Sequence, residues 1–270
     1  MLRRRSVLAA AAALAWRPAR AAGEPVDVLL VLAVDVSRSV DEDEARLQRE
    51  GYRSAVADPA VVEAIRGGMI GAIGLAYVEW AGAEYQRQVL PWLRIAGQAD
   101  ATAWSEKLAE APRASLSWTS ISGALDFSLR VLNDAPFEAT RRVIDISGDG
   151  VNNSGGPVEL ARDRVVAEGV TINGLPIVND RPTFGRRPPL PLDEYYRENV
   201  IGGPGAFVVV AEDFNSFGLA VKRKLIREIA ARPGPDAYTT VLTRAEENDP
   251  PGWDLWLRIR PGDAEQAAMP

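Results

Sequence analysis

The chain contains neither histidine nor cysteine among its 270 residues. Without them it cannot form a Ser-His-Asp or Cys-His nucleophile pair, an imidazole general base or a disulfide. An ordinary zinc site, which depends on the same two residue types, is also excluded. Any metal ion bound by this protein must therefore be a hard cation held by oxygen atoms.

The first 21 residues are expected to be an export signal. Arg3, Arg4 and Arg5 precede an apolar run from Val7 to Trp16, and Ala19-Arg20-Ala21 supplies small residues for cleavage. The run is too short to cross a bilayer, so no membrane span is expected. The stretch from Arg4 to Leu8 resembles the twin-arginine pattern of signals that export folded proteins. The sequence thus predicts an exported, periplasmic protein.

Basic residues are scarce in the remaining chain. Five of the 31 basic residues lie in the signal, which leaves 26 against 37 acidic residues and a net charge of −11. Nucleic acid and anionic membranes are poor partners for such a surface. The length and the apolar content of 47% suit one large domain.

Apolar runs alternate with amphipathic stretches along residues 22–231, which predicts an α/β domain with a doubly wound, mostly parallel sheet and helices on both faces. Residues 86–92 follow the preceding run after a short link, as an antiparallel edge strand does. The expected strands are 28–34, 70–80, 86–92, 142–147, 170–178 and 207–211, and the expected helices start at Asp41 and cover 99–110, 120–132, 157–168 and 214–231.

Two segments break this alternation. Residues 179–205 are rich in proline and glycine and are expected to form an inserted loop. Residues 232–270 form a proline-rich, acidic tail that we expect to be flexible. Within the tail, apolar residues alternate with polar ones from Trp253 to Ile259, a pattern that suits an added edge strand or a partner contact.

Oxygen-bearing side chains gather where the expected strands end. Asp35, Ser37 and Ser39 follow the first strand, Asp149 follows the strand 142–147, and Thr119 lies in the loop before a helix. Ligands collect at the carboxyl ends of strands in an open parallel sheet, and such oxygen ligands suit magnesium. Each hydroxyl also has a purely structural interpretation, as a turn residue or a helix cap.

The stretch Asp35-Val36-Ser37-Arg38-Ser39 resembles the D-x-S-x-S motif of von Willebrand factor A domains, with Thr119 and Asp149 at the remaining metal-site positions. The resemblance covers residues 26–231. It extends to an uncharacterised family of exported bacterial proteins with this domain, through the segments 147–153, 195–197 and 201–207.

This resemblance implies a six-stranded sheet with the antiparallel strand at an edge, and a metal-ion-dependent adhesion site. Ser37, Ser39 and Thr119 would bind Mg²⁺, or Mn²⁺ or Ca²⁺, directly, and Asp35 and Asp149 would do so directly or through water. A carboxylate of a partner protein would fill the open position. The implied function is protein binding, with no catalytic residue.

Three further residues are candidates for a supporting or rim position at the site. Arg38 either flanks the metal and attracts an acidic ligand or points to solvent. Asp145 lies within an apolar strand, where a carboxylate needs a buried partner, or else it supports the metal ligands from behind. Asn152 follows Asp149 in the same loop.

Two other functions compete with adhesion. The stretch from Gly148 to Asn153 also resembles the magnesium loop of haloacid-dehalogenase-like phosphatases, in which Asp35 would be the nucleophile. Those enzymes carry an acid two residues after the nucleophile, where this chain has Ser37, and a lysine, for which only Lys107 is available between the motifs. The other alternative is a scaffold domain that binds its partner through the 232–270 tail.

Overall fold

The computed structural model describes residues 23–38, 40, 42–112, 114, 116–178, 190–213 and 216–230, and the backbone of 240–243. Its centre is a seven-stranded sheet in the order β4-β3-β2-β6-β7-β8-β9. Strand β4 is antiparallel to β3 and lies at one edge, whereas all the other neighbours are parallel. The strands are β2 (Val28–Asp35), β3 (Ile73–Trp80), β4 (Gln86–Ile95), β6 (Arg141–Gly148), β7 (Thr171–Pro176), β8 (Val208–Ala211) and β9 (Thr240–Thr243).

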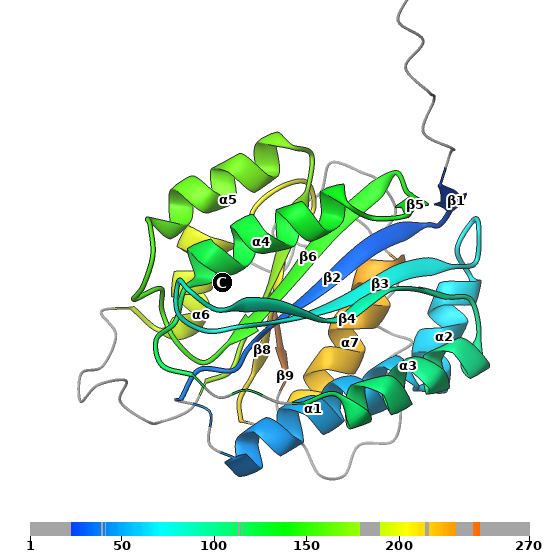
Figure 1. Ribbon diagram of the computed structural model, residues 1–270, viewed down its shortest axis with the longest axis horizontal. Coiled ribbons are helices and arrows are strands. Elements are labelled where there is room, and N and C mark those ends of the chain that lie inside the picture. Colours follow the sequence, from blue (N-terminus) through cyan, green and yellow to red (C-terminus); the bar gives the residue numbers. More distant parts are fainter. Residues whose placement is uncertain are drawn as a thin grey trace, which may run out of the picture.

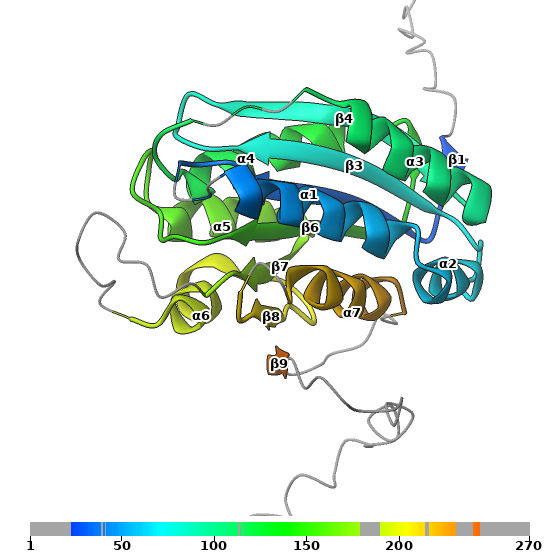
Figure 2. The same cartoon turned by 90° about the horizontal axis from the view of Figure 1, so that it is seen from below.

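Helices cover both faces of this sheet (Figures 1 and 2). One layer contains α1 (Glu42–Val56), α2 (Pro59–Arg66), α3 (Gln98–Glu110) and α7 (Phe217–Ala230). The other contains α4 (Ile121–Asn133), α5 (Val158–Ala167), and the short consecutive helices α6 (Leu192–Tyr195) and η2 (Tyr196–Val200). A separate parallel pair joins β1 (Glu24–Pro25) to β5 (Phe137–Glu138).

Strand β2 shows why the sheet is buried on both sides. All eight of its residues are buried, and successive side chains point to opposite faces. Leu30 and Leu32 join the core beneath α1, α3 and α7, whereas Val31 and Ala33 join the core beneath α4 and α5. A continuous apolar run is the pattern of such a strand.

The α/β class, the mostly parallel sheet and its antiparallel edge strand are confirmed. The six expected strands are all present, and β9 adds a seventh at the far edge. The interpretation of 179–205 as a loop is wrong for residues 192–200, which form helical turns. Residues 179–189, the stretch 253–259 and the signal lie outside the described residues.

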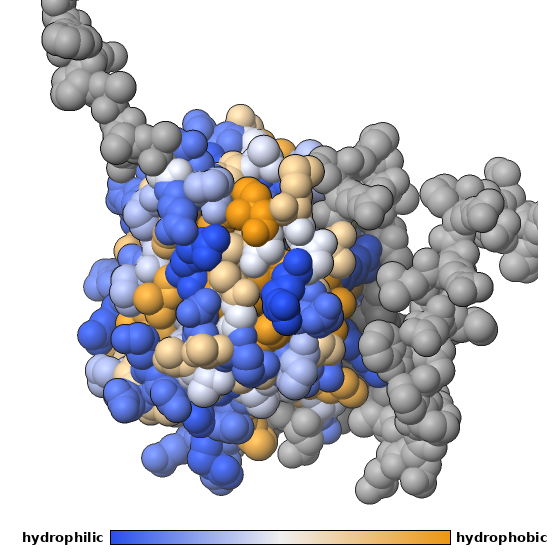
Figure 3. Space-filling model, turned by 90° about the vertical axis from the view of Figure 1, so that its right-hand side faces the viewer, coloured by the Kyte–Doolittle hydropathy of each residue, from blue (hydrophilic) through white to orange (hydrophobic). Residues whose placement is uncertain are grey.

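The surface near β1, β5 and α2, on the right-hand side of Figure 1, is shown in Figure 3. Hydrophilic residues are interspersed there with small, separate apolar patches. None of the helices in the described part of the chain has the length and apolar character needed to cross a membrane.

Candidate metal centre

Asp35 ends strand β2 and begins the candidate site. Its side chain is buried, and its Oδ1 accepts a hydrogen bond from the backbone N–H of Ser37 at 2.7 Å. The N–H of Val36 donates to the carbonyl of Trp80 at 2.8 Å, so the turn is anchored to the end of β3. These bonds fix one oxygen of the Asp35 carboxylate and place the buried Ser37 hydroxyl beside it.

Thr119 is held in place by the loop that follows β6. Its N–H donates to Oδ1 of Asn153 at 2.8 Å, and its carbonyl accepts from the N–H groups of Asn153 and Ser154 at 2.9 and 3.1 Å. A Cβ at Gly150 would lie 3.6 Å from Oγ1 of Thr119. The Thr119 hydroxyl therefore lies next to the loop that carries Asp149.

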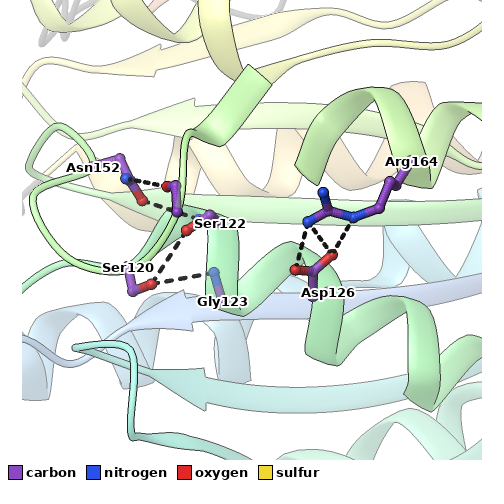
Figure 4. A network of polar contacts seen from close by, with 7 residues as sticks. Ser120, Ser122, Gly123, Asp126, Asn152 and Arg164 are labelled. Atoms are coloured by element: carbon purple, nitrogen blue, oxygen red, sulfur yellow. Dashed lines mark hydrogen bonds and ion pairs between the residues drawn. The ribbon is translucent and has the colours of Figure 1, made fainter. Parts of the chain in front are cut away.

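The start of α4 is tied to the same loop (Figure 4). Oγ of Ser120 accepts a hydrogen bond from the N–H of Gly123 at 3.2 Å, so Ser120 is the N-cap. Asn152 accepts a hydrogen bond from the N–H of Ser122 at 3.0 Å through its Oδ1. The capping role considered for Thr119 thus belongs to Ser120, and the Thr119 hydroxyl is not used as the cap.

The electrostatics of the site favour a cation. Burial raises the pKa of Asp35 well above its ordinary value, and the nearby Asp149 carboxylate raises it further, while hydrogen bonds from Ser37 lower it. Oδ2 of Asp35 is buried and has no hydrogen-bond partner among the described residues. A positive ion at this position would stabilise both carboxylates and satisfy the unpaired oxygen.

The donor set suits a hard divalent ion. Asp35, Ser37, Thr119 and Asp149 offer carboxylate and hydroxyl oxygens, which are the ligands that magnesium and related ions prefer. Within the described ranges, no three acidic side chains lie together as a metal-binding group. A cation at this site would therefore depend on the hydroxyls as well as on the two carboxylates.

Four of the predicted site residues lie at one edge of the sheet. Asp35, Ser37, Thr119 and Asp149 are all buried there, whereas Ser39 is outside the described residues. Arg38 is exposed next to Ser37. Binding of a metal by this set stays a prediction.

Asp145 lies on the face of β6 that is covered by α7. There it has the buried partner that a carboxylate within a strand requires. Its Oδ1 is 2.6 Å from Nζ of Lys224 on α7, which is also 2.5 Å from Oε1 of Glu228. All three side chains are fully or almost fully buried. The sequence pattern did not identify Lys224 and Glu228, because charged residues on an amphipathic helix are usually assigned to solvent.

The residues that a phosphatase would use are arranged differently. Ser37 occupies the position of the second acid, and a hydroxyl cannot replace a carboxylic acid in protonating a leaving group. Lys107 is exposed on α3, a helix that packs against α1 and β4. Thr119 lies just before α4, which belongs to the other layer of the domain.

A family described as "Protein of unknown function (DUF1194)" matches residues 25–233. No curated protein matches the chain. Among solved structures, the chain is similar to a von Willebrand factor type A protein from Catenulispora acidiphila, with 16% identity, a TM-score of 0.51, and coverage of 76% of this chain and 43% of the other.

Two further solved structures share the fold. Proximal thread matrix protein 1 from the mussel byssus, with a zinc-occupied MIDAS motif, is 17% identical with a TM-score of 0.51 and coverage of 74% and 46%. The pilus adhesin SpaC from Lactobacillus rhamnosus GG is 13% identical with a TM-score of 0.53 and coverage of 77% and 31%. The chain thus spans less than half the length of these three proteins, and its fold is that of von Willebrand factor A domains.

Proposed function

The chain belongs to the family described as "Protein of unknown function (DUF1194)", and from its site we propose that it is an exported binding domain. It captures an acidic group of a partner protein through a divalent metal ion. The observation that carries this proposal is the buried Asp35 carboxylate, which has one oxygen fixed by Ser37 and the other unpaired. It interacts with Asp149, whose loop lies next to the Thr119 hydroxyl.

The ion would be held by Asp35, Ser37, Thr119 and Asp149, with Ser39 as the fifth ligand. Mg²⁺ is the expected ion, and Mn²⁺ or Ca²⁺ are the alternatives. When bound, it would supply an open coordination position for a carboxylate. The mussel protein supports the proposal, because its MIDAS motif holds a divalent ion, zinc, on the same fold.

The surroundings of the site indicate which partner it accepts. We call Arg38, Leu116 and Trp118 the rim. Leu116 pairs with Ser37 in a parallel bridge, and Trp118 directly precedes Thr119 with its side chain 56% exposed. Arg38 adds positive charge, and the two apolar residues add contact area. The rim therefore suits an acidic residue with an apolar neighbour.

Trp118 also has an uncommon backbone conformation. Its φ of 73° makes it the one non-glycine residue with positive φ in the described part of the chain. A left-handed conformation costs about 1–2 kcal/mol for an ordinary residue. The adjacent Thr119 is fixed by its hydrogen bonds with Asn153.

Metal binding is tested by thermal unfolding with and without Mg²⁺, using Asp35→Asn and a matched control. The control is Asp126→Asn, which removes an acid on α4 from an exposed ion pair with Arg164 on α5. We expect Mg²⁺ to raise the Tm of the wild type and of the control but not of Asp35→Asn. An equal rise in all three proteins would place the ion elsewhere.

Partner capture is tested by a pull-down from a periplasmic extract, with elution by a chelator. We expect the bound protein to be released by the chelator, to be absent with Asp35→Asn, and to be reduced with Trp118→Ala. Binding by the intact protein that persists in the chelator would refute the adhesion mechanism. Deletion of residues 232–270 separates this mechanism from a tail-mediated scaffold, since retained binding excludes the tail as the main contact.

Export is tested separately by cell fractionation. Replacement of Arg4 and Arg5 by lysine should retain the protein in the cytoplasm, because the twin-arginine pattern requires that pair. Unchanged delivery to the periplasm would show that another route is used.

A further inference from the structure

Tyr196 brings a hydroxyl to the candidate metal centre from a part of the chain far from the ligands in sequence. It is the first residue of η2, and its side chain is fully buried in the core beneath α4 and α5. Its Oη has no hydrogen-bond partner among the described residues. A buried hydroxyl without a hydrogen-bond partner is unfavourable. Its position near the candidate metal centre therefore needs an explanation.

Two glycines allow the Tyr196 ring to reach the site. At Gly174 on β7, a Cβ would lie 2.8 Å from Cδ1 of the ring, too close for a side chain. At Gly148, the last residue of β6, a Cβ would lie 3.0 Å from Oη of Tyr196 and 3.0 Å from Oδ2 of Asp35. The ring therefore crosses β7 where that strand has no side chain, and its hydroxyl reaches the end of β6.

Tyr196 and Asp35 present two unpaired oxygens to the same small space. Because both atoms lie 3.0 Å from one point above Gly148, they are at most twice that distance apart. A direct hydrogen bond after a small rotation, or one bridging water, spans such a gap. A tyrosine hydroxyl is protonated at neutral pH, so it can donate a hydrogen bond to a carboxylate oxygen.

We propose that Tyr196 is a positioning residue of the metal centre, whose hydroxyl holds Oδ2 of Asp35, directly or through one water, in the orientation that the ion requires. This inference rests on the proposed metal site. Groups that orient a metal ligand from behind typically change metal affinity by about 10- to 100-fold when removed. Tyr196 would thus set the affinity of the site without touching the ion.

The test compares Tyr196→Phe with Tyr52→Phe. Each variant removes one buried phenolic hydroxyl, but that of Tyr52 lies on the other face of β6 and donates to Oγ of Ser147 at 2.9 Å. The measurements are the Mn²⁺ dissociation constant, the Tm with and without the ion, and the tyrosine ultraviolet difference spectrum on adding the ion.

For Tyr196→Phe we expect Mn²⁺ affinity to fall by about 10-fold or more, and the metal-induced tyrosine difference spectrum to disappear. Its metal-free Tm should change little, because the Tyr196 hydroxyl has no direct hydrogen-bond partner among the described residues. For Tyr52→Phe we expect the reverse, a lower metal-free Tm with unchanged affinity.

Wild-type affinity and an unchanged difference spectrum in Tyr196→Phe would overturn the role of Tyr196 and leave the metal site standing. A fall in its metal-free Tm that accounts for the weaker binding would also overturn it, since the residue would then be structural. If the wild-type protein itself binds no Mn²⁺, the proposed function fails and this inference fails with it.

Discussion

Replacement of Lys224 should strongly destabilise the fold. Its ammonium group is fully buried, 2.6 Å from Oδ1 of Asp145 on β6 and 2.5 Å from Oε1 of Glu228 one turn along α7. Nδ2 of Asn173 on β7 donates to the same Glu228 oxygen at 2.8 Å. Lys224→Met keeps most of the side-chain volume and removes the charge that contacts both carboxylates.

The expected loss follows from the burial of all three groups. Removing one partner of a buried ion pair leaves an uncompensated charge and costs about 3–5 kcal/mol. In a domain of this size, each 1 kcal/mol lowers Tm by about 2–4 °C. We therefore expect Lys224→Met to lose about 3–5 kcal/mol of unfolding free energy at pH 8 and to melt about 6–20 °C lower.

The loss should depend on pH. Burial raises the pKa of Asp145 to about 7, against the opposing effect of Lys224, and Glu228 adds to the rise. The folded state thus binds a proton between about pH 4 and 7 that the unfolded state releases, so this group makes the protein less stable as pH rises through that range, by at most about 1.4 kcal/mol per pH unit. Without Lys224 the pKa of Asp145 rises further, so protonation at pH 5 relieves part of the penalty.

Urea unfolding at pH 5 and pH 8 measures both effects. Lys222→Met is the matched control, because Lys222 lies on the same helix and pairs with Asp58 at 2.8 Å with side chains 34% and 25% exposed. That pair should contribute no more than about 1 kcal/mol. A loss in Lys224→Met no larger than in the control at pH 8, or equal losses at the two pH values, would refute the reasoning.

Three further substitutions test other contacts. Asp145→Asn should leave Mg²⁺ affinity unchanged while altering stability, because its carboxylate lies on the other face of β6; weaker metal binding in titration calorimetry would show that it supports the site. Asn153→Ala removes the acceptor for the Thr119 N–H, so we expect a loss of about 1–3 kcal/mol in urea unfolding together with weaker Mg²⁺ binding; a variant equal to wild type in both would show that the loop is held by other bonds. Gly174→Ala places a Cβ 2.8 Å from the Tyr196 ring and should lower stability by about 1–3 kcal/mol; an unchanged Tm would show that the ring moves aside freely.

The site residues that are close in the chain could be anticipated from the sequence. Asp35 and Ser37 follow an apolar run, and two residues of an extended turn necessarily stay near each other. Thr119 and Asp149 could be assigned to the same edge because parallel strands end together at one side of a sheet.

The supporting contacts could not be anticipated in the same way. Asn153 is one of several polar residues in a loop, and its hydrogen bonds to Thr119 depend on how two loops meet. Tyr196 lies in a segment whose prolines and glycines predict a loop, yet residues 192–200 form helical turns that bury its ring. No local pattern shows that Gly174 leaves room for that ring.

The amino-acid sequence by itself determined the class of this protein. The lack of histidine and cysteine restricts metal ligands to oxygen, which is a matter of composition alone. The alternation of apolar runs and amphipathic stretches specifies a sheet with helices on both faces, because it depends only on local periodicity. The tertiary structure alone decided that Lys224 is buried against Asp145 and that the Tyr196 hydroxyl and Asp35 both lie close to Gly148. Each of these contacts joins elements distant in sequence, and its geometry depends on how helices and strands pack rather than on any local pattern.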